Sequence, residues 1–177
     1  MNKSADKVRF KGKVATRGEA SALINKPGDA ALIERGRPRL LLVNCPCGCG
    51  QHFPINLDPR AGPAWRLYWN RQRELSLYPS VWRESDCMSH YVIWRNKIFL
   101  LGKYENDFDA CLQPDNAIRL VDAVRQRLPE SGLVSFSQIA DELDAIPWDV
   151  LIVCRRLVRA GVAREGLGTE RGSFGRA

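Results

Sequence analysis

Two kinds of segment are missing from this sequence of 177 residues: a long apolar run and an apolar leader. No stretch approaches the roughly 18 consecutive apolar residues that a membrane-spanning helix needs. The start, Met-Asn-Lys-Ser-Ala-Asp-Lys, has none of the apolar core that a signal peptide requires. We therefore expect a cytoplasmic protein with no membrane segment.

The length and composition exclude two further classes, a large enzyme scaffold and a disordered chain. Hydrophobic residues make up 45% of the sequence and charged residues 27%, which is a globular composition. A chain this short forms one or two small domains. The formal net charge of +7 leaves a polyanionic partner open.

The N-terminal part divides into a basic arm and the beginning of a β-rich region. Residues 1–18 have little apolar content and six Lys and Arg, so we expect a flexible basic arm. Two short apolar runs, 22–24 and 31–33, flank the turn signal Lys26-Pro27-Gly28-Asp29. This pattern predicts two short strands around a tight turn.

Alternation of apolar and polar residues becomes clear further along. Trp65, Leu67 and Trp69 fall on one face of a predicted strand, with polar residues between them. An Asn at the turn Arg95-Asn96-Lys97 suits a hairpin, because Asn tolerates the left-handed conformation. We expect a β-rich domain over residues 19–108, with strands at 39–43, 65–70, 75–81, 90–94 and 98–101.

The character of the sequence changes after Gly102. Apolar residues at helical spacing predict helices at 115–128 and from Pro147 onward, with a short strand leading into another helix at 134–143. Residues 162–164 read as the first strand of a small wing. This order predicts a winged helix-turn-helix domain over 109–166 and a disordered tail over 167–177. The fold class is therefore α+β.

Four of the six cysteines are spaced as metal ligands. Cys45, Cys47 and Cys49 fall within five residues, and Cys87 follows about forty residues later. A reducing compartment disfavours disulfides, and structural zinc sites take about four ligands from two separate segments. We expect a structural Zn²⁺ site on these four cysteines, with His52 and His90 as further candidate ligands. Cys111 and Cys154 are expected to be packing residues.

A second group of chemically capable residues overlaps the first. Ser80 and Ser89 both lie within reach of His90 on what should be adjacent strands, and a serine nucleophile needs a base within hydrogen-bond distance. Ser89 and His90 are sequence neighbours that point to opposite faces of a strand, so a Ser80–His90 pair is easier to form. The alternative is that Ser80 belongs to a turn and His90 is a zinc ligand, and the pattern by itself favours this alternative.

These motifs together resemble those of a known family. The order is Cys45-Pro-Cys-Gly-Cys-Gly50, Trp65, Ser76-Leu-Tyr-Pro-Ser-Val81, Cys87-Met-Ser-His-Tyr-Val-Ile93 and Asn96-Lys-Ile98. It resembles a family of small bacterial domains, some of which are encoded beside ubiquitin-like proteins and their activating and conjugating enzymes. The resemblance covers residues 28–103. Related sequences carry Cys at the position of Ser89.

The resemblance implies a peptidase of a bacterial ubiquitin-like conjugation pathway. Such an enzyme trims the ubiquitin-like precursor or removes the protein from its targets, so the implied partners are the ubiquitin-like protein, its conjugates and the conjugation enzymes. In this interpretation the four cysteines form a closed zinc site and His90 is the base. Ser80 is the preferred nucleophile and Ser89 the reserve, with Asp86 or Glu84 as candidates to orient the imidazole.

Two competing functions stay open. A catalytic zinc with three protein ligands and a bound water is disfavoured, because no His-x-x-x-His pair lies near the cysteines. A zinc-containing adaptor or DNA-binding regulator could use the basic residues Arg155, Arg156 and Arg159 to contact phosphates. The start of that helix, with Trp148, Asp149 and Val150, is poorly suited to reading bases, so we expect the domain to dock proteins.

Overall fold

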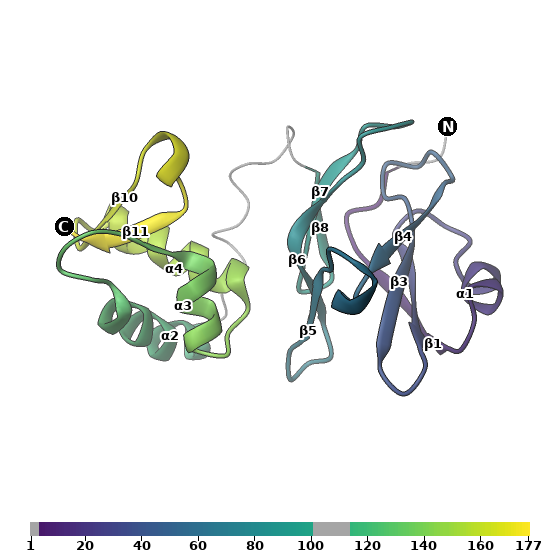
Figure 1. Ribbon diagram of the computed structural model, residues 1–177, viewed down its shortest axis with the longest axis horizontal. Helices are drawn as coiled ribbons and strands as arrows, with labels where there is room; N and C mark the ends of the chain where they lie inside the picture. The colour runs from purple at the N-terminus through teal and green to yellow at the C-terminus, as the bar shows by residue number, and fades with distance from the viewer. Residues whose placement is uncertain (1–3, 101–113) are drawn as a thin grey trace. The chain divides into compact units, whose positions relative to one another are not determined.

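The computed structural model describes residues 4–100 and 114–177 and divides the chain into two compact units, Met1–Tyr104 and Glu105–Ala177 (Figure 1). The expected combination of β-sheets and helices is confirmed. In the described part of the chain, no helix has the length and apolar character needed to cross a membrane. The predicted boundary at 108 and Cys111 lie outside the described residues.

Two four-stranded sheets build the first unit. The first sheet has the order β1 (Arg9–Val14), β2 (Asp29–Glu34), β3 (Pro38–Asn44) and β4 (His52–Asn56), with β1 parallel to β2 and the other pairs antiparallel. The second sheet is antiparallel and has the order β5 (Arg66–Trp69), β6 (Leu75–Trp82), β7 (His90–Trp94) and β8 (Lys97–Leu100). A 3₁₀ turn, η1 (Pro59–Ala61), lies between β4 and β5.

The main core of this unit lies between the two sheets. Side chains at alternate positions of both sheets are buried in it, which follows from the two-residue period of a strand. These residues include Leu32, Leu41, Val43 and Ile55 from the first sheet and Leu75, Leu77, Val81, Tyr91 and Ile93 from the second. The predicted strands at 65–70, 75–81, 90–94 and 98–101 are confirmed within one or two residues.

A short helix, α1 (Arg17–Leu23), covers the outer face of the first sheet (Figure 1). Ala20 and Ile24 pack there against Ala31, Ile33 and Leu42. β2 is therefore buried on both faces, which explains its continuous run of apolar residues. The prediction of a strand at 22–24 is wrong, because these residues end α1. A capping box between Thr16 and Glu19 starts this helix and is readable in the sequence.

The prediction of a flexible arm over residues 1–18 is also wrong. Arg9–Val14 form β1, an edge strand whose exposed Arg9, Lys11 and Lys13 alternate with less exposed residues. Arg9 Nε lies 2.7 Å from the buried carboxylate of Asp29. The charged residues of this segment are the outward half of a strand pattern, as edge strands often carry.

Three helices and a small sheet form the second unit. They are α2 (Pro114–Arg127), β9 (Val134–Ser135), α3 (Phe136–Glu142), α4 (Pro147–Arg159), β10 (Ala163–Glu165), η3 (Gly168–Glu170) and β11 (Ser173–Arg176), and the sheet order is β10-β11-β9. The predicted helices and the strands at 134 and 163 are confirmed, and the assignment as a winged helix stays a prediction. Cys154 is buried in the core on α4, as expected.

The expected disorder of residues 167–177 is contradicted. β11 pairs with both β10 and β9, and Phe174 is fully buried in the core of the unit. Its burial fixes the last strand, because a buried aromatic ring stabilises a fold by a few kcal/mol. A single Phe among Gly and Arg residues gives little periodic signal in the sequence.

Candidate functional site

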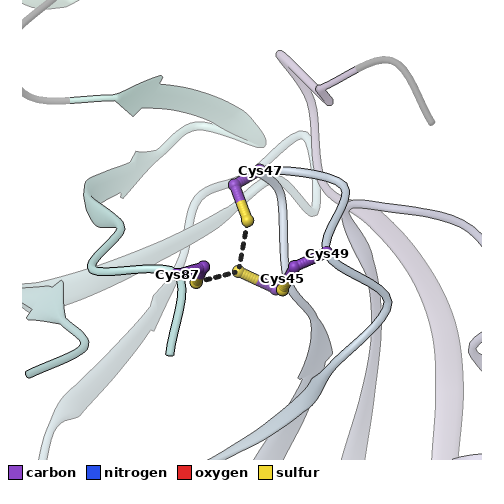
Figure 2. Close-up of side chains that lie close together, drawn as sticks. All are labelled: Cys45, Cys47, Cys49 and Cys87. Carbon is purple, nitrogen blue, oxygen red and sulfur yellow. Dashed lines mark hydrogen bonds between the residues drawn. The ribbon is translucent and has the colours of Figure 1, made fainter. Parts of the chain in front are cut away.

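The four cysteines come together from two separate segments of the first unit. Cys45, Cys47 and Cys49 lie in the turn that follows β3, and Cys87 lies in the loop between β6 and β7 (Figure 2). Gly48 permits the tight turn, because its φ of 89° is in the left-handed region. The amide of Gly48 donates a hydrogen bond to the Cys45 carbonyl at 3.2 Å.

The geometry of the sulfur atoms fits a tetrahedral metal ion. All four Sγ atoms lie within 4.8 Å of one another, and Cys45 Sγ is 3.4 Å from Cys47 Sγ and 3.7 Å from Cys87 Sγ. A tetrahedral zinc ion with Zn–S bonds of about 2.3 Å holds its sulfurs about 3.8 Å apart. In the described part of the chain, this group contains four cysteines and no histidine. The residues could therefore hold one Zn²⁺ with every position filled by sulfur.

The surroundings of the cluster favour ionised sulfur at Cys87. Burial opposes ionisation of this thiol, but hydrogen bonds from the hydroxyl and amide of Ser89 and from neighbouring thiols outweigh burial and lower its pKa to about 6. At Cys47 burial raises the pKa. Metal binding removes protons from such thiols, because thiolate is the form that ligates.

A serine and a histidine lie close together where β6 ends and β7 begins. His90 Nε2 lies 3.0 Å from Ser80 Oγ, within hydrogen-bond distance. The pairing of the strands is irregular here: Val81 pairs with Tyr91, and the next pair is Leu77 with Ile93, so β6 contains two extra residues. This bulge carries Ser80 toward His90, a device often found beside functional sites.

Two tryptophans support this pair. Trp65 Nε1 donates a hydrogen bond to the Ser80 carbonyl at 3.2 Å. Trp82 stacks on the His90 ring, with centroids 5.6 Å apart and an interplanar angle of 28°. Trp82 is also 58% exposed, which is unusual for so large an apolar side chain. Sequence reasoning missed Trp82, although its place two residues after Ser80 puts it on the same side of β6.

Ser89 and His90 point to different sites, as expected for neighbours in an extended chain. Ser89 is buried, and its Oγ lies 3.3 Å from both Cys45 Sγ and Cys87 Sγ. The structure thus brings Ser80 to His90 and Ser89 to the cysteine cluster. His52, the other candidate ligand, begins β4, where it pairs with Asn44 of β3, and is not in the cluster.

Neither of the carboxylates suggested as partners of His90 forms a hydrogen bond with it. Asp86 accepts a hydrogen bond from Arg83 Nη2 at 2.9 Å. Glu84 is exposed. Among residues 4–100 and 119–177, no carboxylate hydrogen-bonds the His90 ring. His90 is thus hydrogen-bonded to Ser80 and stacked on the Trp82 ring.

Acidic residues outnumber basic residues in the second unit, which disfavours binding of a polyanion such as nucleic acid. Residues 105–177 contain nine Arg and no Lys against 12 Asp and Glu, whereas residues 1–104 contain 18 Lys and Arg against eight Asp and Glu. At the start of α4, Val150 is in the core and Trp148 stacks on Phe136 at 6.1 Å. The residues that would read bases in a helix-turn-helix are therefore used for packing.

Comparison with known proteins connects the first unit to one family. Residues 17–101 match the model of a family described as bacterial ubiquitination-like system serine protease (BubE). The matched region contains the four clustered cysteines, Ser80, Ser89 and His90. No curated protein and no solved structure matches the chain. Over this region the chain is thus similar to serine proteases of bacterial ubiquitination-like systems, which is the pathway that the sequence motifs implied.

Proposed function

We propose that the chain is a serine peptidase that processes or deconjugates a bacterial ubiquitin-like protein. The observation that carries the proposal is the 3.0 Å distance between His90 Nε2 and Ser80 Oγ, in a region similar to a serine protease family. The proposed partners are the ubiquitin-like protein and its conjugates, with the activating and conjugating enzymes of the same pathway.

The proposed chemistry is acyl transfer in two steps. His90 takes the hydroxyl proton while Ser80 Oγ attacks the carbonyl carbon of the last residue of the ubiquitin-like protein. His90 then gives this proton to the leaving amine, and the C–N bond breaks to leave an ester on Ser80. A water molecule, deprotonated by His90, attacks the ester, and the proton returns to Ser80 as the acid leaves. One serine and one base suffice for this cycle of proton transfers.

The cysteines have a structural part in this proposal. Four thiolates fill a tetrahedral Zn²⁺ shell, and closed shells of this kind are structural. The ion would hold the turn after β3 to the loop before β7. Cys87 stands three residues before His90, so the site would fix the end of the strand that carries the base.

The second unit is proposed to dock proteins. Its excess of acidic residues and the packing of Trp148 and Val150 favour a protein partner over DNA. The test is to measure binding to a DNA duplex by the wild type and by a variant with Arg155 and Arg159 both replaced by Ala. The docking role would be contradicted if the wild type bound tightly, if binding fell steeply with salt, and if the double variant lost binding.

The direct test of the peptidase uses a ubiquitin-like protein from the same genome that carries a C-terminal extension. The full chain should remove the extension, Ser80→Ala should not, and Ser89→Ala should do so when zinc is in excess. Cleavage by Ser80→Ala at the wild-type rate would overturn the assignment of the nucleophile. Loss of cleavage on chelation while the chain stays folded would instead assign the chemistry to the metal.

A further inference from the structure

A buried arginine lies against the cysteine cluster. Arg83 is only 7% exposed, and its Nη1 lies 3.5 Å from Cys87 Sγ and 3.8 Å from Cys49 Sγ. Its guanidinium also lies over the Phe53 ring, 5.1 Å from the centroid. A buried cation is costly unless it has anionic partners, and hydrogen bonds between charged groups are the strongest kind. The placement of Arg83 therefore provides Cys87 Sγ and Cys49 Sγ with a buried cationic donor.

Asp86 compensates only part of the positive charge of Arg83. It bonds Arg83 Nη2 at 2.9 Å, but its side chain is 60% exposed and its charge is screened by water. The other arm of the guanidinium, Nη1, is directed at sulfur. A planar fork of donors can serve a carboxylate with one arm and thiolates with the other, which a lysine cannot do in the same way.

Ser89, which directly precedes β7, also contacts the cysteine cluster and shares Cys87 Sγ with Arg83. Its side chain is 8% exposed, and Oγ lies 3.3 Å from Cys45 Sγ and from Cys87 Sγ. The Arg83 amide donates a hydrogen bond to the Ser89 carbonyl at 3.0 Å, so the backbone fixes the two residues relative to each other. A hydroxyl between two sulfurs can donate its hydrogen to either one, and thiolate is the better acceptor.

Four thiolates around one divalent cation leave a net charge of −2 at a partly buried site. Hydrogen-bond donors from the protein are needed to stabilise this charge. We propose that Arg83 and Ser89 are the outer hydrogen-bonding shell of the four-cysteine metal site, and that they stabilise its metal-bound form. Ser89 is then a positioning residue for the metal ligands and has no part as a nucleophile. This inference rests on the metal site of the proposed function and is independent of the peptidase activity.

The test measures zinc affinity on the purified, reduced full chain by competition with a chromophoric chelator. Ser89→Ala and Arg83→Met should each weaken zinc binding about 10-fold to 100-fold, the usual effect of losing an outer-shell partner. Arg83→Lys, which keeps the charge, should recover part of that loss. The matched controls are Ser85→Ala and Arg71→Met, which remove an exposed hydroxyl and an exposed guanidinium. Both controls should bind zinc like the wild type.

Several outcomes would overturn the proposal. Zinc affinities of Ser89→Ala and Arg83→Met within 2-fold of the wild type would do so, as would equal losses in the control variants. A wild-type chain that binds no zinc would remove the metal site and this inference together. If Arg83→Met does not fold, Ser89→Ala and Arg83→Lys carry the test. Weakened zinc binding in a chain that cleaves no substrate would support this inference while refuting the peptidase.

Discussion

The contact between Trp82 and His90 gives a quantitative prediction for catalysis. The centroids of the two rings lie 5.6 Å apart, and the ring planes are inclined by 28°. A stacked aromatic pair contributes about 0.5–1.5 kcal/mol beyond area burial. The indole also favours the imidazolium that forms when His90 accepts the serine proton, since a cation is attracted to the face of an aromatic ring. Among residues 4–100 and 119–177 no carboxylate hydrogen-bonds His90, so we expect the Trp82 ring to help orient the imidazole.

Trp82→Ala should therefore lower kcat/KM about 2-fold to 13-fold, which corresponds to 0.5–1.5 kcal/mol at the transition state. The loss should be in kcat, and Trp82→Phe should recover most of it, because phenyl also stacks. The assay is steady-state cleavage of the extended ubiquitin-like protein. Trp69→Ala is the matched control: Trp69 is also partly exposed on this sheet, but it packs against Phe10.

Two results would refute the reasoning about Trp82. The first is a Trp82→Ala variant with unchanged kcat/KM. The second is a loss confined to KM, which would make Trp82 a substrate contact and leave His90 oriented by other means. Equal losses in Trp82→Ala and Trp69→Ala would show a general effect on the sheet.

Three further predictions concern the metal, the pH dependence of stability and the unclustered thiol. Removing zinc from the reduced protein should lower the thermal midpoint of the first unit by about 10 °C or more, since each kcal/mol lost shifts a domain of this size by about 4–8 °C; an unchanged midpoint in calorimetry would contradict a structural metal. Burial opposes ionisation of Asp29, but hydrogen bonds from the Lys26 amide, Arg9 and the Asn25 amide lower its pKa. The ionised carboxylate thus stabilises the fold above its ordinary pKa of about 3.9, and this contribution is lost as the pH falls through the lowered value; urea unfolding at pH 7 and pH 3 should show a larger loss for the wild type than for Asp29→Asn, and equal losses would contradict it. Burial and then the charge of Glu165 raise the pKa of Cys154 to about 12, so this thiol should resist Ellman's reagent in the native protein at pH 8 and react after unfolding, whereas rapid native labelling would contradict its burial.

Sequence patterns predicted those parts of the fold in which one period is repeated. Alternation located β6, β7 and β8, and helical spacing located α2 and α4, because each of these buries one face. β1 was missed because its apolar half is short and its charged half dominates the composition. α1 was missed for a different reason: its apolar residues, read alone, suit a strand, and the decisive signal is the capping box at Thr16.

The sequence predicted which residues form the candidate site better than it predicted the contacts between them. The spacing of Cys45, Cys47, Cys49 and Cys87 predicted the cluster, and their placement on adjacent strands made Ser80 and His90 a candidate pair. The direction of Ser89 depends on which face of β7 turns toward the cluster, which no local pattern reveals. Arg83 is a similar case. A lone arginine in a loop is expected to be exposed, and only the folded structure shows that this one is buried.

The most direct test of the account is to trap the acyl-enzyme. The extended ubiquitin-like protein is mixed with the full chain, the reaction is quenched in acid within its first turnover, and the adduct is located by peptide mass mapping. We expect an ester between the ubiquitin-like protein and Ser80 Oγ, and no such ester with the His90→Ala variant. Cleavage that proceeds with no adduct, or with an adduct on Ser89 or on a cysteine, would contradict it.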